Sequence, residues 1–599
     1  MVRRNGGYMP TYSLYIINML ICFQCITMTE VAKASPKLNK QQLGEAWKTV
    51  KWKKCQRHVD RLQRSIALAT ERGDKKMVRK LGRILYKSES WNLICTRRIT
   101  QDNKGKKTAG VDGVKLLDPA QRMDLVVKLT PRIERKWSPV KQIEIPKKNG
   151  KIRTLGIPTI KDRIYQAKLK GIIEPCYEAI AEPNTYGFRP MRSTKDAIAQ
   201  IFLSVRRKEE AWVLEGDLKG FFDNIKTEAI ISNPTIRDDK EIVATIRNLV
   251  KSGAMTVNQE QIKTEIGTPQ GGVISPLLAN IAFTGMETMI NKWAWKNRAR
   301  TGQRQKRDCP VQVSVYADDF VVIANERWII EELESVIRQW CIEKMGVELS
   351  KEKTHITNVE NGFDFLGCNI RKYRINNTKT KTLIKPSKAS IKSIKLKIKD
   401  ICKSGYRLSQ DELIRKLNPV IIGWAEYHKG NVAKEVFNAI DSYIFKRLWK
   451  WTKRRHSNKG NTWIKDKYWH KVGKDNWVFK TNKNCLRNMA DTKIVRHTKV
   501  KSEHHIFDGR EEYWVKRRFM NKSGIKTRKE ARLIKQKFRC NKCGELFRHD
   551  SIMELDHIIP THCGGSESVD NLQVLHRHCH DEKSPNDGSY NRKWQKTGY

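Results

Sequence analysis

The sequence predicts a multidomain α+β protein. Its 599 residues correspond to about four domains of ordinary size. Apolar residues recur at helical spacing in two stretches of the chain, whereas the region between them mixes short apolar runs with Gly and Pro. A hydrophobic share of 39%, with 17 Trp, is enough to build buried cores and excludes a wholly disordered chain.

The chain is strongly basic. It carries 118 Lys and Arg against 64 Asp and Glu, which gives a formal charge of +54. This excess predicts a polyanionic partner, because Lys and Arg displace counterions from a phosphate backbone. The 14 Cys lack the dense spacing of a small secreted scaffold. They indicate a reducing compartment, so we expect an organelle or a bacterial cytoplasm and exclude secretion.

Residues 1–36 form an N-terminal extension. Within it, residues 11–28 are largely apolar, which leaves open an extension without structural role, an organelle-directed segment or a membrane anchor. The run contains polar residues and is shorter than the about 20 apolar residues that a spanning helix needs. We therefore expect no obligate membrane partner.

Residues 37–100 predict a helical region with one basic face. Apolar side chains recur every three or four positions, and Lys and Arg fill the positions between them. The same bias recurs along much of the chain. It favours contact with nucleic acid, although a solvated charged face would show the same pattern.

Residues 101–370 have the mixed texture of an α/β domain and contain two acidic motifs. At 311–323, alternating Val residues precede Asp318 and Asp319, which predicts a hairpin with two acids at its tip. About a hundred residues earlier, a second strand leads into Asp217. Asp is also an ordinary turn residue. If the two strands pair, however, three carboxylates meet, and their repulsion requires a cation.

Such a cluster predicts nucleotidyl transfer. Three carboxylates can hold two Mg²⁺ ions about 4 Å apart. One ion would lower the pKa of an attacking hydroxyl, and the other would stabilise the leaving pyrophosphate.

Further blocks make the pattern specific. They are 153–158 (RTLGIP), 186–190 (YGFRP), 217–222 (DLKGFF), 267–272 (GTPQGG), 316–319 (YADD), 349–354 (LSKEKT) and 363–367 (FDFLG). In this order they resemble the reverse transcriptases encoded by group II introns. The resemblance implies a right-hand polymerase with fingers and palm, in which Asp217, Asp318 and Asp319 are the catalytic ligands of Mg²⁺.

The resemblance also implies a dNTP site. Phe222 would exclude a 2′-hydroxyl, and Gln270 with the Gly after it would let the backbone approach the base pair. Lys151 and Arg153 would grip the triphosphate, unless they are ordinary surface cations. Lys353 would protonate the departing pyrophosphate.

Residues 385–450 return to helical spacing, within a domain that we place at 371–456. Its residues 413–430 (LIRKLNPVIIGWAEYHKG), with those that follow up to 456, resemble the thumb-like maturase domain of intron-encoded proteins, which implies binding of structured intron RNA. Residues 457–537 are rich in Lys and Arg. They predict a DNA-binding segment whose four Trp could stack on bases, with a flexible tether as the alternative. These Trp are Trp463, Trp469, Trp477 and Trp514.

Residues 538–599 contain a cluster of Cys and His. Two knuckles, Cys540-x-x-Cys543 and His576-x-x-Cys579, have the spacing of a structural Zn²⁺ site, in which His562 or His578 could substitute for His576. Between the knuckles lie 556–560 (DHIIP), 564–565 (GG) and 571–572 (NL), and His580 follows the second knuckle. These residues resemble an HNH nuclease with a ββα-metal core, and a zinc ribbon without cutting activity is the alternative.

The nuclease resemblance implies roles for four residues. His557 would act as general base, and Asp556 and His580 would bind a catalytic divalent ion, expected to be Mg²⁺. Asn571 would hold the loop that orients the base.

Together these features predict an RNA-directed DNA polymerase encoded by a group II intron. It would bind intron RNA in a ribonucleoprotein, assist splicing, nick target DNA and use dNTPs to copy the RNA from the exposed 3′ end. Two alternatives remain: a splicing-only maturase that has lost polymerisation, and a retron-like reverse transcriptase with another partner.

Overall fold

The computed structural model describes residues 39–587, apart from 116–117, 147–149, 151, 207, 209, 256–260, 263–270, 306–308, 377–379, 474 and 521–527. The apolar run at 11–28 and two expected dNTP ligands, Lys151 and Gln270, lie outside these residues. Within them, no helix is both long and apolar enough to cross a membrane.

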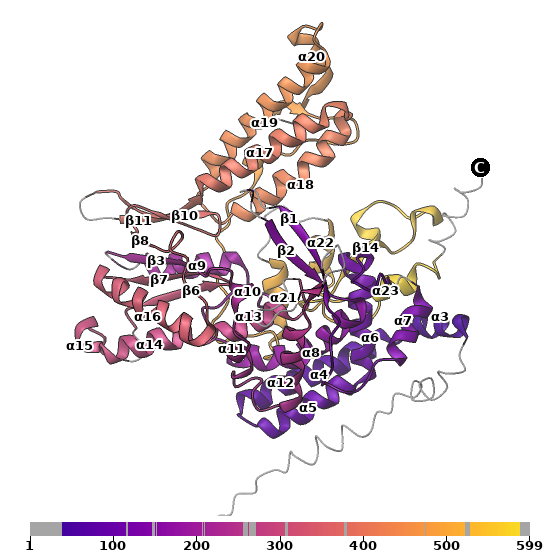
Figure 1. Ribbon diagram of the computed structural model, residues 1–599. Helices are drawn as coiled ribbons and strands as arrows, with labels where there is room; N and C mark the ends of the chain where they lie inside the picture. Colours follow the sequence, from indigo (N-terminus) through magenta and orange to yellow (C-terminus); the bar gives the residue numbers. More distant parts are fainter. Residues whose placement is uncertain are drawn as a thin grey trace, which may run out of the picture.

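The chain begins with a helical region that packs on the next part of the protein (Figure 1). The apolar stripe of α4 faces inward, where Val59, Leu62 and Ile66 are fully buried, and α4 lies against α8 in one continuous core. The helices are α3 (Lys40–Lys48), α4 (Trp52–Glu71), α5 (Lys75–Lys87), α6 (Glu89–Arg97), α7 (Pro119–Val127) and α8 (Ile160–Ile180).

A small sheet with strand order β2-β1-β4-β5 lies beside these helices. Its main pair is an antiparallel hairpin, in which Arg153 lies opposite Ile145. The strands are β1 (Val140–Pro146), β2 (Ile152–Ile157), β4 (Ala254–Met255) and β5 (Gln261–Ile262).

A second four-stranded sheet, of order β6-β7-β3-β8, carries the acidic motifs. Helices cover both faces of this sheet. Consecutive strand residues point to opposite faces, so Val213 packs in the core beneath α9 and Leu214 packs in the core beneath α13 and α16. The elements are β3 (Trp212–Asp217), β6 (Gln312–Tyr316), β7 (Asp319–Ala324), β8 (His355–Asn358), α9 (Thr194–Val205), α13 (Ser275–Phe283), α14 (Met286–Lys296) and α16 (Arg327–Met345).

Short helices connect these layers: α10 (Phe221–Asn224), α11 (Thr227–Ile231), α12 (Lys240–Lys251) and α15 (Arg298–Thr301). A three-stranded sheet follows the four-stranded sheet that carries the acids. Its strands are β9 (Phe363–Phe365), β10 (Cys368–Arg374) and β11 (Thr380–Pro386), in the order β11-β10-β9. The helices of the next region therefore begin only at Lys388, where Ser387 caps the first of them by accepting from Ser390 N at 3.1 Å.

Three long helices project from the body of the protein and form a core of their own (Figure 1). They are α17 (Lys388–Ser404), α18 (Gln410–His428) and α19 (Lys434–Arg455). The first part of the basic segment packs on this core through α20 (Asn461–Tyr468), β12 (Trp469–Val472) and β13 (Asp475–Phe479).

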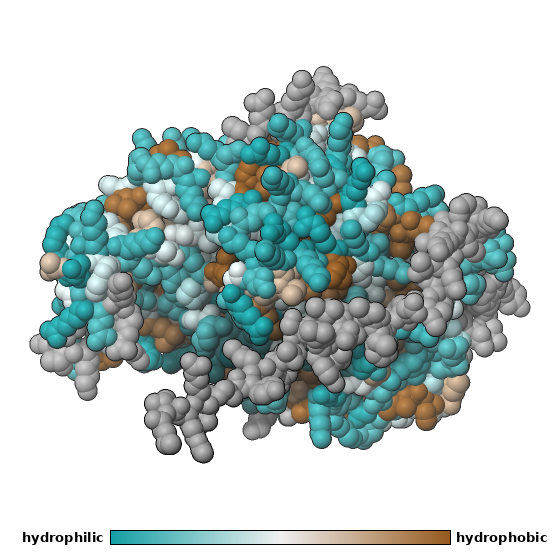
Figure 2. Space-filling view, turned by 90° about the horizontal axis from the view of Figure 1, so that it is seen from below, coloured by the Kyte–Doolittle hydropathy of each residue, from teal (hydrophilic) through white to brown (hydrophobic). Residues whose placement is uncertain are grey.

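The last part of the chain returns to the first helices. It contains α21 (Glu511–Met520), α22 (Arg528–Lys535), β14 (Met553–His557), β15 (Leu572–His576) and α23 (Arg577–Lys583). Arg57, Arg97 and Arg98 pair with acids of this terminal domain. The face seen in Figure 2 is mostly hydrophilic with small separate apolar patches, as expected for a chain of charge +54.

Candidate functional site

Three carboxylates meet at one end of the second four-stranded sheet. β3 pairs antiparallel with β7, so Asp217 lies directly opposite Asp319. Asp318 immediately precedes β7 in the tight turn after β6, where Ala317 has a left-handed φ of 59°. The structure thus brings together the three acids that the sequence places a hundred residues apart.

A glycine lets a second segment approach this turn. Thr185 forms a parallel bridge with Val315, and Tyr186 N donates to Val315 O at 2.9 Å. A Cβ on Gly187 would lie 2.2 Å from the backbone nitrogen of Ala317, a distance that no side chain can occupy. Asn280, a buried residue of α13 that sequence reasoning missed, donates to Gly187 O at 2.8 Å. Its only signal is a polar residue within an otherwise apolar helix.

The acids disfavour one another's charge. Burial, followed by repulsion from Asp318 and Asp217, raises the pKa of Asp319 to about 7. Burial and Asp217 likewise raise the pKa of Asp318. Lys353 Nζ lies 2.7 Å from Asp217 Oδ2, and this hydrogen bond raises the pKa of the Lys353 ammonium. The donor set is oxygen-only and over-charged, which suits Mg²⁺.

Of the other expected dNTP residues, the structure describes Phe222 and Arg153. Phe222 is half-buried, and its ring lies edge to face with that of Phe188, with 5.8 Å between centroids. Arg153 is in β2 and contributes a positive potential at Asp318. Gly271 has a φ of 113°, and a Cβ there would lie 2.5 Å from Gly156 O, so the backbone of Gly271 itself packs tightly on β2.

A second cluster of titratable groups lies in the terminal domain, on β14, β15 and α23. Asp556 Oδ1 is 3.8 Å from His580 Nε2, so both can reach one ion. The Nε2 atom of His557 is buried and has no hydrogen-bond partner among the residues that the structure describes, and it lies 3.6 Å from Glu567 Oε2. The structure therefore brings Asp556 and His580 together, and it places His557 next to Asp556 in the sequence of β14, beside Glu567.

Asn571 fixes the loop that follows β14. Its Oδ1 accepts from Ile559 N at 2.9 Å, and its Nδ2 donates to Ile559 O at 2.9 Å and Ser566 O at 2.8 Å. A Cβ on Gly565 would lie 1.9 Å from Ile559 O, so this loop closes only with glycine there.

Two further residues hold Asp556 and were not expected from the sequence. Lys583 Nζ lies 3.0 Å from Asp556 Oδ2, and Gln573 Nε2 donates to the same oxygen at 3.0 Å. Lys583 follows the knuckle by four residues on α23, and Gln573 is the cross-strand partner of Asp556. Both reach Asp556 because of the ββα arrangement, which no local spacing reveals.

The four expected zinc ligands converge. Their ligand atoms all lie within 4.8 Å of one another: Cys540, Cys543, His576 and Cys579. His562 and His578 do not belong to this group, although the His578 ring stacks on that of His576 at 5.1 Å. Three thiols and one imidazole at this spacing suit a closed tetrahedral Zn²⁺ site.

The prediction that four Trp of the basic segment stack on bases is wrong for two of them. Trp469 and Trp514 are buried, with 2% and 6% exposed, and belong to cores. Trp463 and Trp477 are 39% and 51% exposed. Apolar burial against α19 and the second sheet accounts for the difference.

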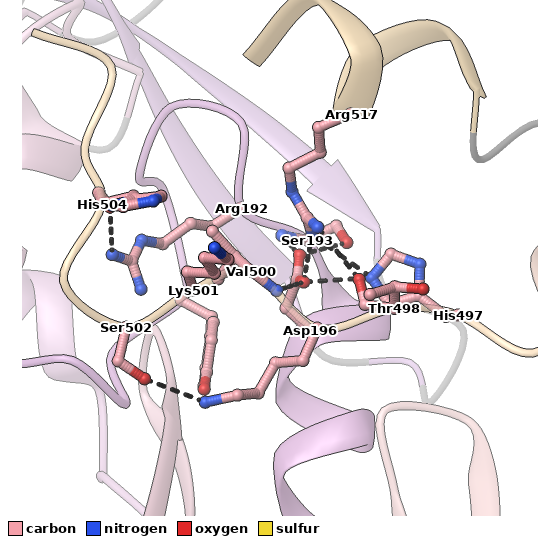
Figure 3. A network of polar contacts seen from close by, with 12 residues as sticks. Arg192, Ser193, Asp196, His497, Thr498, Val500, Lys501, Ser502, His504 and Arg517 are labelled. Atoms are coloured by element: carbon pink, nitrogen blue, oxygen red, sulfur yellow. Dashed lines mark hydrogen bonds and ion pairs between the residues drawn. The ribbon is translucent and has the colours of Figure 1, made fainter. Parts of the chain in front are cut away.

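The basic segment is also anchored to the body of the protein (Figure 3). Asp196 on α9 is completely buried, and it accepts from Val500 N at 2.9 Å and from Arg517. His497 Nε2 lies 3.0 Å from the same carboxylate. These contacts lower the pKa of Asp196 to about 2. Residues 497–517 are therefore a docked part of the fold rather than a free tether.

Four family models match the chain in order. They are the N-terminal domain of reverse transcriptase over 47–129, reverse transcriptase (RNA-dependent DNA polymerase) over 145–370, the group II intron maturase-specific domain over 391–469 and HNH endonuclease over 540–586. Protein YkfC of Escherichia coli (strain K12) is 31% identical over 339 residues, which cover 52% of this chain and 87% of that protein.

Group II intron-encoded protein LtrA of Lactococcus lactis subsp. cremoris is 32% identical over 305 residues, covering 41% of this chain and 49% of LtrA. The chain belongs to the group II intron-encoded reverse transcriptases. This reverse transcriptase carries an RNA-directed DNA polymerase domain, a maturase domain and an HNH endonuclease domain. Maturase-like protein 1 of Euglena gracilis is a more distant relative, 24% identical over 425 residues that cover 66% of this chain and 84% of that protein.

Proposed function

We propose that this protein polymerises DNA at Asp217, Asp318 and Asp319. The cross-strand pairing of Asp217 with Asp319 supports this site, because it gathers carboxylates whose pKa values are raised by burial and mutual repulsion. Two Mg²⁺ ions bound there would activate the primer hydroxyl and stabilise the leaving pyrophosphate. Lys353 is within reach of the same carboxylates and would supply a proton to the pyrophosphate.

Substrate choice at this site is assigned to the residues around it. The ring of Phe222 would block the 2′-hydroxyl of an NTP, and the contact with Phe188 holds that ring in place. Arg153, together with Lys151, would bind the triphosphate of the dNTP by charge-assisted hydrogen bonds.

RNA binding is assigned to the basic helices at the two sides of the polymerase. The maturase helices α17–α19 present Lys and Arg on their outer faces, which suits contacts to a structured RNA backbone. In this way the protein would hold the intron RNA as a ribonucleoprotein and assist its splicing.

DNA cutting is assigned to the terminal domain. His557 would take a proton from the attacking water, since its Nε2 has no hydrogen-bond partner within the described part of the chain. Asp556 and His580 would hold a divalent ion, expected to be Mg²⁺, near the scissile phosphate. Zn²⁺ at the Cys540 knuckles would be structural, and Asn571 would hold the loop next to the base.

These activities form one cycle. The ribonucleoprotein nicks target DNA with the nuclease, and the exposed 3′ end primes copying of the intron RNA by the polymerase. The intact acid triad argues against a splicing-only maturase, and the maturase and HNH matches argue against a retron-like enzyme.

A primer-extension assay on an RNA template with dNTPs and Mg²⁺ tests the polymerase. Asp318→Ala is expected to abolish extension and leave nicking of target DNA intact, whereas His557→Ala is expected to do the reverse. If neither wild type nor Asp318→Ala extends the primer while splicing continues, the splicing-only alternative is established.

A further inference from the structure

A buried amide lies between the zinc cluster and the nuclease carboxylate. Gln573 is only 5% exposed and lies directly opposite Asp556 in the β14–β15 pairing. Its Nε2 donates to Asp556 Oδ2 at 3.0 Å, and its Oε1 accepts from Asn541 Nδ2 at 2.9 Å. Asn541 lies inside the Cys540-x-x-Cys543 knuckle, so two hydrogen bonds connect that knuckle to the carboxylate.

The orientation of the Gln573 amide is determined by its acceptors. Its Nε2 faces two of them, the Asp556 carboxylate and the carbonyl of His557 at 3.4 Å. Rotating the amide by 180° would place Oε1 against both acceptors. With Nε2 held in this way, Oε1 points to the knuckle and accepts from Asn541 Nδ2.

This arrangement distinguishes the two oxygens of Asp556. Oδ2 is held by Gln573 and by Lys583 Nζ, both at 3.0 Å. Oδ1 is the oxygen that lies 3.8 Å from His580 Nε2. Hydrogen bonds to one oxygen of a ligating carboxylate orient the other toward the metal, and their loss typically weakens metal binding about 10- to 100-fold.

We propose that Gln573 is a positioning residue that couples the zinc knuckle to the divalent-ion ligand Asp556. Through Asn541, an intact knuckle holds the Gln573 amide, and the amide aims Asp556 Oδ1 at the ion shared with His580. Loss of Zn²⁺ then lowers the affinity of the nuclease site for its divalent ion, although both ligands, Asp556 and His580, are still present. The inference rests on the proposed nuclease role of Asp556 and His580.

Mn²⁺ binding to the full chain tests this coupling. Asp318 and Asp319 are first replaced by Ala, so that the nuclease site dominates Mn²⁺ binding measured by electron paramagnetic resonance. In this background, Gln573→Leu and the milder Asn541→Ala are each expected to weaken Mn²⁺ affinity at least tenfold. Zinc content measured by mass spectrometry is expected to stay at one ion per chain.

Asn586→Ala is the matched control, because it removes another exposed Asn of the same domain that touches neither Gln573 nor Asp556. It should leave Mn²⁺ affinity unchanged. Affinity within twofold of the control in both Gln573→Leu and Asn541→Ala, with zinc retained, overturns the coupling. Asp556→Ala separates the two hypotheses: if it too leaves Mn²⁺ affinity unchanged, the proposed nuclease ion site itself fails.

Discussion

At the scale of single residues, Gly187 is a position where the polymerase site tolerates little change. A Cβ there would meet backbone atoms of Ala317, which cannot move without displacing the Asp318–Asp319 turn. We expect Gly187→Ala to lower the rate of primer extension at least tenfold, because small misplacements of catalytic groups are costly. Nicking by the terminal domain should be unaffected.

Gly423→Ala is the control for that experiment, since a Cβ at this helical position of α18 meets no atom within 4 Å. It should leave extension unchanged. Equal extension by Gly187→Ala and wild type would contradict the tight packing on the acidic turn.

Asp196 gives a pH-dependent prediction. Its folded pKa, about 2, lies below the ordinary value of 3.8, so its contribution to stability is complete above pH 5 and declines as pH falls toward 2. We expect Asp196→Asn to destabilise the protein by about 2 kcal/mol at pH 7. The difference in melting temperature from wild type should narrow to about half at pH 3 by fluorescence-monitored unfolding.

The exposed Asp400 on α17 provides the comparison, because Asp400→Asn should shift the melting temperature little at either pH. A pH-independent difference for Asp196→Asn would mean that lost packing, rather than the carboxylate's charge, destabilises the variant.

At the scale of elements, the end of α19 and the β12–β13 hairpin form an aromatic surface. Phe445, Trp449 and Trp477 have ring centroids 6.0 to 6.3 Å apart, and Phe445 and Trp477 are 38% and 51% exposed. Exposed lysines, Lys446 and Lys450, flank the rings. Bases stack on such surfaces with about 1–3 kcal/mol each.

We therefore expect Trp477→Ala to weaken binding of single-stranded RNA about 5- to 100-fold in a fluorescence-anisotropy titration. Trp328→Ala, at a partly exposed Trp of α16, is the matched control and should bind as wild type does. If both variants bind equally well, the aromatic surface does not stack on bases.

The elements themselves differ in how far the sequence predicts them. Alternating Val residues predict the β6–β7 hairpin. The strand that ends at Asp217 is expected to pair with this hairpin, and β3 does pair with β7 there. The roles of Trp469 and Trp514 are not predictable from their basic surroundings, since their burial depends on α19 and on the second sheet. Gln573 gives no signal, because it reaches Asp556 only across strands.

At the scale of the whole molecule, ion pairs hold the nuclease domain against the first helices. Arg98 on η2 (Arg98–Asp102) pairs with Asp550, Arg97 Nη2 lies 2.8 Å from Asp581 Oδ2, and Arg548 Nη1 lies 2.8 Å from Asp60 Oδ2. A cavity of about 220 Å³ lies between the two surfaces. Sequence patterns cannot predict this contact, because its partners lie 452 and 484 residues apart.

Removing one partner should weaken this contact, because Arg98→Ala removes the guanidinium that pairs with Asp550 across the two surfaces. We expect Arg98→Ala to increase amide hydrogen exchange at residues 543–551, as measured by mass spectrometry. The palm strands β3 and β7 should exchange as in wild type. The control is Arg79→Ala, because Arg79 lies on α5 away from the nuclease domain; this variant should not change exchange at 543–551. Unchanged exchange in Arg98→Ala would show that the ion pairs do not hold the nuclease domain in place.

The partners in these ion pairs are synthesised at different times. During translation, Arg98 emerges 452 residues before its partner Asp550. At about 5–20 residues per second, the gap lasts roughly 20 to 90 seconds. Throughout that interval Arg98 lacks its Asp550 partner, so the contact between the first helices and the nuclease domain can form only after the polymerase and maturase regions have been synthesised.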